Sequence, residues 1–355
     1  MALIRLNTRS LPDNAVTTAK VADNAVTSAK ALNLGRRNIL INGAMQIYQR
    51  GSTTFAHDGT TSGYSLDRFN MALGGTHEQL DGTLAQASDH PTSANGKSLK
   101  WTTGTAESSY DADEYVYIVQ KIEAQNLQHL QYGNSNAEAI TISFYVKSSI
   151  TGTYAFGLYK EDSTARIFNK TYTIDSANTW EKKTLTFVGD TDSGAGIVND
   201  NGTGLYVSWH LSAGTNAKGG GSVGAWKNYG GLTDWADGQG TNAVMTTASA
   251  TWQMTECQLE VGSQATAFEH RSFGEEFTLC QRYYEFIDRI YPHVYYSGVS
   301  IANFFYSEKR ATPSATANVN AANMSFNLVG KNSGYLYKGS AETSGVQGLK
   351  LDAEL

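Results

Sequence analysis

The residues most suggestive of chemistry lie in one irregular stretch, positions 214–242, of this 355-residue chain. Its glycine run, Gly219 to Gly224, fits both G-x-S-x-G, the pattern of a nucleophilic serine, and G-x-G-x-x-G, the pattern of a dinucleotide-binding loop. Either chemistry requires a strand before the glycines and a helix after them. The flanking residues predict neither element. We therefore expect no catalytic residue and a protein that is not an enzyme.

Three aromatic residues follow the glycines: Trp226, Tyr229 and Trp235. The flat faces of sugar rings stack on exposed indole and phenol rings, and a glycine-rich loop can present such rings at the surface. These three residues are therefore the candidate glycan-binding residues. Trp and Tyr also fill the ends of β-sandwiches and subunit interfaces, so packing is the alternative, and the sequence favours it.

Acidic residues cluster at two places where oxygen ligands could hold a structural Ca2+: Asp111 with Asp113 and Glu114, and Asp190 with Asp192. Ca2+ takes about six to eight oxygen ligands, and neither cluster has the spacing of an EF-hand. Solvated turns are the better interpretation of both clusters. We expect no cofactor.

The sequence contains no pattern for a transition-metal site. Its seven histidines are scattered and form no H-E-x-x-H motif, and its two cysteines, Cys257 and Cys280, stand far apart. Paired cysteines and histidines at short spacings are typical of zinc sites. We expect no metal ligands and two buried free thiols.

The composition favours strands joined by turns. Charged residues make up 17% of the chain, below the ~25% usual for soluble domains, while there are 35 glycines and 20 tyrosines. Strands prefer β-branched and aromatic residues, and turns prefer Gly and Asn. The net charge of −6, without a basic run, argues against a nucleic-acid partner. The chain has neither a signal-peptide-like start nor about 18 consecutive apolar residues, so we expect cytoplasmic synthesis and no membrane insertion.

Residues 36–272 are predicted to form an antiparallel, jelly-roll-like β-sandwich. Residues 139–147 show the alternation of a half-buried strand, which turns one set of side chains to the core. That set is Ile140, Ile142, Phe144 and Val146. Further strands are predicted at 154–159, 167–172, 184–188, 205–211 and 252–261, and a short helix near 122–130. Many strands without regular helix alternation indicate a sandwich.

A connecting helix is predicted over residues 273–289. Ser272 and Glu275 have the S-x-x-E spacing of a capping box at a helix start. Apolar residues at three- and four-residue spacing then form one stripe: Phe273, Phe277, Cys280, Tyr284 and Ile287. Residues 290–355 are predicted to be a small C-terminal β-domain, with strands near 294–296, 299–306, 315–319, 324–328 and 335–337.

A ten-residue repeat opens the chain, because residues 13–20 (DNAVTTAK) return at 23–30 (DNAVTSAK). The larger apolar residues have a spacing of five, which fits neither a helix nor a strand. They are Leu11, Val16, Val21 and Val26. We interpret residues 1–35 as an extended docking segment that needs a partner surface. A flexible polar linker is the alternative.

Several blocks of the sequence resemble the fibre and receptor-binding proteins of tailed bacteriophages, whose central part is similar to a carbohydrate-binding-module β-sandwich. The blocks are 37–51 (RNILINGAMQIYQRG), 64–69 (YSLDRF), 142–148 (ISFYVKS), 258–262 (QLEVG) and 267–284 (AFEHRSFGEEFTLCQRYY), with the N-terminal repeats and 351–355 (LDAEL). Within the second block, Asp67 and Arg68 are expected to form a buried or partly buried ion pair at a strand end. The resemblance implies a location in the virion, a homotrimer, and attachment to a phage tail or capsid protein through the N-terminal end.

The function that we expect is that of a structural fibre subunit, a tail fibre that adheres to host cell-surface polysaccharide. A capsid-bound head fibre or decoration protein is the alternative, because it would share the fold and the docking segment. A glycan-degrading spike is a weaker alternative. Such spikes resemble long parallel β-helices, and this sequence has no repeating rungs.

Overall fold

The computed structural model describes most of the chain after the N-terminal repeats. The predicted docking residues Leu11, Val16, Val21 and Val26 lie outside the described residues, so the interpretation of 1–35 stays a prediction. The described ranges are 36–50, 53–219, 223–241, 243–291, 293–296, 299–317, 325–338 and 346–355.

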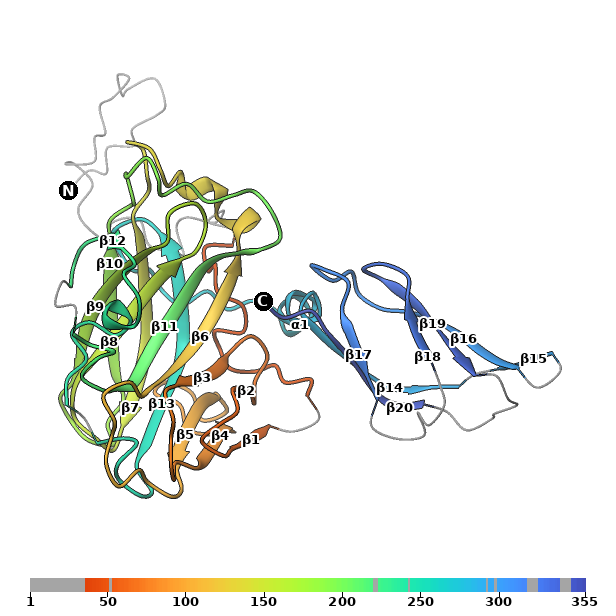
Figure 1. Cartoon of the computed structure of the whole chain (residues 1–355), viewed down its shortest axis with the longest axis horizontal. Helices are drawn as coiled ribbons and strands as arrows, with labels where there is room; N and C mark the ends of the chain where they lie inside the picture. The colour runs from red at the N-terminus through yellow and green to blue at the C-terminus, as the bar shows by residue number, and fades with distance from the viewer. Residues whose placement is uncertain are drawn as a thin grey trace, which may run out of the picture. The chain divides into compact units, whose positions relative to one another are not determined.

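Two antiparallel sheets lie face to face in the first part of the described chain (Figure 1). One sheet has the strand order β1 (Thr54–His57), β4 (Gly82–Ala87), β5 (Ser98–Thr103), β13 (Thr251–Val261), β7 (Ile140–Ser148) and β10 (Glu181–Phe187). The other has the order β12 (Lys227–Asn228), β9 (Arg166–Ile174), β8 (Gly152–Lys160), β11 (Thr203–Ala213), β6 (Tyr115–Glu123), β3 (Asn70–Gly74) and β2 (Gly63–Tyr64). The five strands predicted between 154 and 261 are confirmed.

The order of the strands makes the sandwich a jelly roll. Strands β8 and β9 pair as a hairpin in one sheet, and β7 and β10, which flank them in the sequence, pair in the other. The next strands outward repeat this alternation, since β6 pairs with β11 and β5 pairs with β13. Nested pairs that switch sheet in this way are the winding of a jelly roll. The predicted fold class is confirmed.

The core lies between the two sheets and is built from the inward face of each strand. Phe144 of β7, predicted to face inward, is fully buried. It meets Trp209 of β11 edge to face at 5.9 Å between ring centroids, and Trp209 meets Phe156 of β8 at 5.1 Å. Edge-to-face pairs of this kind contribute about 0.5–1.5 kcal/mol beyond the burial of apolar area. Cys257 and Cys280 are buried free thiols, as predicted.

The connecting helix is shorter than predicted. Helix α1 covers Phe273–Gln281, and Ser272 caps it by accepting a hydrogen bond from the Glu275 backbone N–H, as the sequence indicated. Residues after the helix form strand β14 (Tyr284–Ile290), which pairs with β20 (Val346–Asp352). The aromatic and β-branched residues of β14 fit a strand well, and a partner strand more than 50 positions away overrides their helical spacing. Within α1, only Cys280 is buried.

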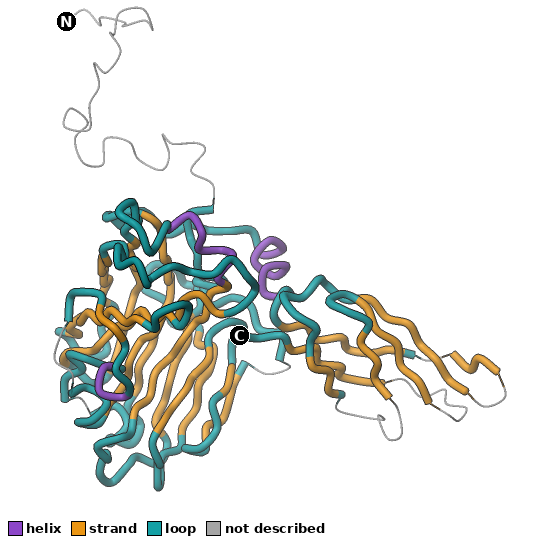
Figure 2. The backbone as a smooth tube through the Cα atoms, turned by 45° about the horizontal axis from the view of Figure 1, so that its top comes forward, coloured by secondary structure: helices purple, strands orange, loops and turns teal. Residues whose placement is uncertain are grey.

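The other helical segments of the described ranges are 3-10 turns. Figure 2 shows helical segments in purple. The helix predicted near 122–130 is the turn η2 (Ala124–Leu130), whereas Ile122 still belongs to β6. A second turn, η3 (Leu232–Asp234), follows β12. No helix in the described ranges has the length and apolar character needed to cross a membrane.

The C-terminal residues form two small antiparallel sheets. One has the order β14, β20 and β17 (Ser314–Thr316), and the other β15 (His293–Tyr296), β16 (Val299–Phe305), β19 (Ser333–Lys338) and β18 (Ser325–Leu328). They have their own small core of Ile290, Ala302, Phe304, Tyr306, Leu336, Leu349 and Leu351. Residues 38–355 belong to one compact unit, so the predicted domain division at 272 and 290 stays a prediction.

Buried arginines fasten these C-terminal strands to the sandwich. Arg68 does not pair with Asp67, as the sequence suggested, but with Glu354. Asp67 instead accepts hydrogen bonds from the backbone and side chain of Gln49. Glu354 also pairs with Arg50 at 3.0 Å, and its side chain is 7% exposed. Asp67 and Arg68 lie in the turn between β2 and β3, where Arg68 has a left-handed backbone (φ 73°), and their side chains contact different partners.

We predict that Glu354→Ala lowers the free energy of unfolding by about 3 kcal/mol, because it leaves the Arg68 guanidinium buried without its carboxylate. Chemical denaturation of the full chain measures this loss. Asp288→Ala, which removes an exposed carboxylate from β14, is the matched control and should change stability by less than about 0.5 kcal/mol. Equal losses in the two variants would contradict a structural role for the Arg68–Glu354 pair.

Candidate functional site

An aromatic patch covers the outer face of the seven-stranded sheet. Because side chains alternate along a strand, burial of Val116 and Ile118 in the core turns Tyr115 and Tyr117 of β6 outward. Neighbouring strands β8 and β11 add further tyrosines, and the segment after β12 adds two rings. The aromatic patch consists of Tyr115, Tyr117, Tyr159, Tyr206, Tyr229 and Trp235.

The rings of the patch are in continuous contact. Tyr159 lies at the centre, with its ring centroid 4.8 Å from that of Tyr229 and 5.2 Å from that of Tyr206. Trp235 lies 5.4 Å from Tyr159 and 5.3 Å from Tyr117. Tyr115 and Tyr117 are stacked at 5.8 Å. Trp235 is 8% exposed, and the other five rings are half-buried.

The segment after β12 is fixed by polar contacts, which position its two rings. The Lys227 ammonium forms ion pairs with Asp234, at 2.7 Å, and with Asp237. The Asn169 side-chain amide of β9 donates to the Asp234 carbonyl oxygen at 2.6 Å. Strand β9 therefore holds the backbone directly before Trp235 against the sheet.

The patch lines a cavity of about 480 Å3 that also presents polar side chains. The Lys121 ammonium lies 4.8 Å from the centroid of the Tyr206 ring, and Asn70 and Glu161 line the same cavity. Its volume falls within the ~300–1,000 Å3 of typical small-molecule sites. Glu161 is the one carboxylate side chain among the described residues that line it.

The tyrosine hydroxyls of the patch stay protonated at neutral pH. Burial raises the pKa of Tyr229 to about 12 and also raises the pKa of Tyr117 and Tyr159 above the usual value. A protonated phenol can both donate and accept a hydrogen bond. Combined with flat apolar rings, these groups suit a ligand that has apolar faces and many hydroxyls. They supply no nucleophile and no general base.

The structure brings together two of the three predicted aromatic residues. The ring centroids of Tyr229 and Trp235 are 5.9 Å apart, and both residues line the patch cavity. Trp226 lies elsewhere: its ring packs edge to face on Phe168 and Tyr132, at 5.5 and 5.6 Å. Its indole N–H donates to the Val188 carbonyl at 2.8 Å. The packing interpretation therefore describes Trp226, whereas glycan binding by the other two stays a prediction.

Sequence reasoning missed the four tyrosines of strands β6, β8 and β11. The signal was present in the run Tyr115-Val-Tyr-Ile-Val119, where two tyrosines alternate with apolar residues. That alternation shows that both tyrosines share a face. It does not show which other strands lie beside β6, so the patch itself could not be predicted.

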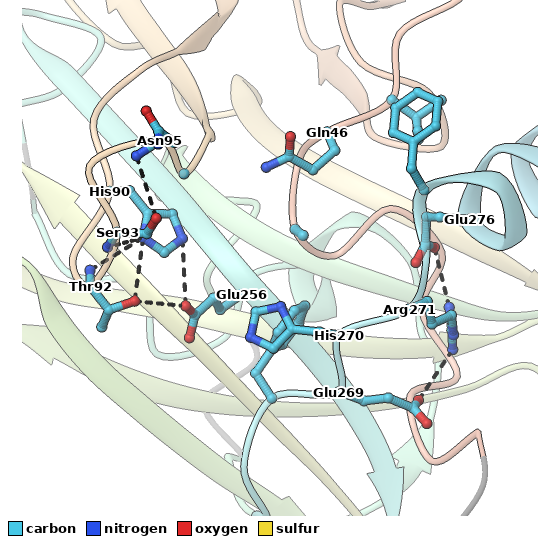
Figure 3. Close-up of a pocket in the computed structure, with 15 residues that line it drawn as sticks. Gln46, His90, Thr92, Ser93, Asn95, Glu256, Glu269, His270, Arg271 and Glu276 are labelled. Atoms are coloured by element: carbon cyan, nitrogen blue, oxygen red, sulfur yellow. Dashed lines mark hydrogen bonds and ion pairs between the residues drawn. The ribbon is translucent and has the colours of Figure 1, made fainter.

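A second cavity, of about 460 Å3, lies where His90, Thr92 and Glu256 meet (Figure 3). The His90 Nε2 atom is 3.5 Å from Glu256 Oε1, and the Thr92 hydroxyl donates to the same oxygen at 3.0 Å. His90 Nδ1 already accepts hydrogen bonds from the backbone N–H groups of Thr92 and Ser93. The Thr92 hydroxyl is also 3.4 Å from His90 Nδ1, but this nitrogen already accepts from two backbone N–H groups and is poorly placed to act as a base toward that hydroxyl.

Carboxylates of the two acidic clusters considered for Ca2+ have other partners or are buried in the fold. The Asp190 carboxylate is buried and engaged by the Arg166 guanidinium at 2.6 and 3.0 Å, so it is a poor Ca2+ ligand. Asp113 accepts a hydrogen bond from the Asn216 side chain at 2.6 Å. Its neighbour Glu114 turns inward and is buried.

No protein-family profile matches this sequence, and no curated protein matches it. Solved structures similar to part of it are carbohydrate-binding modules. A family 11 module of a Clostridium thermocellum cellulosomal cellulase is 12% identical (62% of this chain, 99% of that chain, TM-score 0.29). The family 22 module of C. thermocellum Xyn10B is 14% identical (63% and 98%, 0.28), and a family 22 tandem from Paenibacillus barcinonensis Xyn10C is 12% identical (86% and 90%, 0.27). Such TM-scores support no inference, so the fold and the site rest on the strands and side chains of this chain.

We predict that Trp226→Ala lowers the free energy of unfolding by about 2 kcal/mol, because it removes a ring that packs on the core and a hydrogen bond to Val188. Trp226→Phe, which keeps an aromatic ring at this position, should lose less than half as much. Chemical denaturation of both variants tests the packing role. A Trp226→Ala protein as stable as the parent chain would show that this ring does not contribute to the core.

Proposed function

We propose that this chain is a carbohydrate-binding protein that holds a glycan on the aromatic patch. The observation that supports the proposal is the cluster of six contacting aromatic rings on one face of a sheet, five of them partly exposed, beside Lys121, Asn70 and Glu161. Single exposed aromatic residues are ordinary, but a group of this kind in a cavity is a feature of binding sites.

The chemistry of the patch matches that of a sugar chain. The C–H faces of a pyranose ring are apolar and can lie on Tyr159 and its neighbours, as apolar groups do on aromatic faces. The hydroxyls around the ring can exchange hydrogen bonds with the tyrosine hydroxyls and with Lys121, Asn70 and Glu161. A fixed sheet presents these groups with little loss of conformational entropy on binding.

We further propose that the bound glycan is not cleaved. Hydrolysis of a glycosidic bond usually requires two carboxyl groups about 5–10 Å apart across the bond. Among the described residues lining the patch cavity, only Glu161 has a carboxylate side chain. Binding without catalysis is therefore favoured over a glycan-degrading spike.

The biological setting that we propose is a tailed-phage particle, in which this chain is a homotrimeric fibre subunit. The support for this setting is the sequence resemblance of the blocks at 37–51, 64–69 and 267–284 to phage fibre proteins. In this setting residues 1–35 attach the protein to a tail or capsid protein, and the patch adheres to host surface polysaccharide. A head fibre or decoration protein on the capsid is the alternative, and it would use the same patch.

We predict that Tyr159→Ala weakens glycan binding at least fivefold, since it removes the central ring of the patch and about 1 kcal/mol of stacking. A glycan array first identifies a ligand for the full chain, and titration calorimetry then measures its affinity for the variant. Tyr335→Ala removes a tyrosine that is 37% exposed on β19 and should bind as the parent chain does. A bound glycan whose affinity is the same for both variants would place the site away from the patch.

We also predict that a chain lacking residues 1–35 keeps the thermal transition and the glycan affinity of the full chain but no longer enters phage particles. The physical reason is that the five-residue apolar spacing cannot form a core of its own. Calorimetry and incorporation during infection measure the two properties. If the truncated chain is incorporated normally, the docking role of these residues is wrong.

A further inference from the structure

Three side chains of the types that bind metals meet in the interior, outside the cavities described above. His77 lies between β3 and β4, Glu107 lies between β5 and β6, and Glu114 directly precedes β6. Their nitrogen and oxygen atoms all lie within 4.8 Å of one another. His77 Nδ1 is 3.6 Å from Glu107 Oε1 and 3.7 Å from Glu114 Oε1, and the three side chains are only 0–2% exposed.

The charges in this cluster are not balanced by the protein. Among the described residues, neither an arginine nor a lysine forms an ion pair with Glu107 or Glu114. By contrast, the buried carboxylates of Asp190 and Glu123 each have a guanidinium beside them. Two ionised carboxylates taken out of water without a cation cost several kcal/mol. The described residues therefore provide no arginine or lysine to compensate the charges of Glu107 and Glu114.

His77 is aimed into the cluster, and none of its polar contacts there is a hydrogen bond of normal geometry. Both of its ring nitrogens are buried, with the Glu107 carboxylate and backbone groups of Gly74 and Tyr115 near the ring. A buried imidazole usually donates one ring N–H and accepts at the other nitrogen. The carboxylates, in contrast, are held in place: Glu107 accepts from the Leu80 backbone N–H at 3.1 Å, and Glu114 from that of Asp111 at 2.8 Å.

We propose that His77, Glu107 and Glu114 bind one divalent transition-metal ion, with Zn2+ as the reference ion. Ligands about 2.1 Å from a tetrahedral Zn2+ are separated from one another by about 3.4 Å. The two distances from His77 Nδ1, 3.6 and 3.7 Å, require only a small contraction. One imidazole and two carboxylates suit Zn2+ or Mn2+, whereas Ca2+ prefers six or more oxygen ligands.

The bound ion offsets both carboxylate charges and is coordinated by the imidazole nitrogen that faces them. It also joins the two loops that carry His77 and Glu107 to the start of β6. Glu114 is followed directly by Tyr115, the first ring of the aromatic patch, so the ion fixes one border of that surface. The metal site stands on its own residues and does not depend on glycan binding.

The test uses the full chain, freed of metal by a chelator and then titrated with ZnCl2 in a calorimeter. We expect one Zn2+ per chain, a dissociation constant in the micromolar range or tighter, and a thermal transition that rises with Zn2+ concentration. Glu107→Gln combined with Glu114→Gln keeps the shapes of the side chains but removes both charges. This double variant should bind Zn2+ at least about 100-fold more weakly, because even outer-shell partners contribute up to that much.

His90→Ala is the matched control, since it removes the imidazole of another His–Glu contact, His90 with Glu256, and should leave the Zn2+ affinity unchanged. If the double variant does not fold, His77→Gln replaces it. Three results would overturn the proposal: a folded parent chain that binds no Zn2+, undiminished binding in the double variant or in His77→Gln, or saturation by CaCl2 in preference to ZnCl2.

Discussion

The alternation of side chains along each strand is the constraint on which the rest of this structure depends. Because Val116 and Ile118 point into the core, the alternating Tyr115 and Tyr117 must point to the outer face of the sheet. The register between strands then decides which rings become neighbours: Tyr206 of β11 lies directly opposite Tyr159 of β8. A shift of one residue in either strand would bury the tyrosines and expose the core. The patch is thus specified by the same packing that stabilises the sandwich.

The sequence was informative where structure is local. Alternation identified β7 and its inward residues, and the spacing of Ser272 and Glu275 identified the start of α1. Contacts between residues far apart in the sequence could not be predicted in this way. Residues 284–290 form a strand because they pair with β20, and the aromatic patch forms because β6, β8 and β11 lie side by side. No short stretch of sequence is enough to predict either feature. Asp67 and Arg68 show the same limit, because their partners lie 18 and 286 positions away and not next to them.

Buried charge has a distinct role in this fold. Arg68 and Arg282 contact Glu354 and Glu123, respectively, and each pair joins the sandwich to residues after α1. Such pairs recover the cost of desolvation only when the geometry is right, so they disfavour other arrangements of the same segments more than they add stability. The Arg68 guanidinium also lies 3.4 Å from the centroid of the Tyr283 ring. Its position is therefore fixed by an aromatic face as well as by a carboxylate.

The separation of Arg68 and Glu354 by 286 positions has a consequence for how the protein is made. During synthesis, the jelly-roll strands leave the ribosome before Glu354 has been made. In this incomplete chain the Arg68 guanidinium is solvated or pairs temporarily with another group. Long-range pairing of this kind slows folding and prolongs the exposure of strand edges. The segment that carries Glu354 can therefore pair with Arg68 only after the whole sandwich has been synthesised, and a chain that stops before Glu354 leaves the Arg68 guanidinium without its carboxylate.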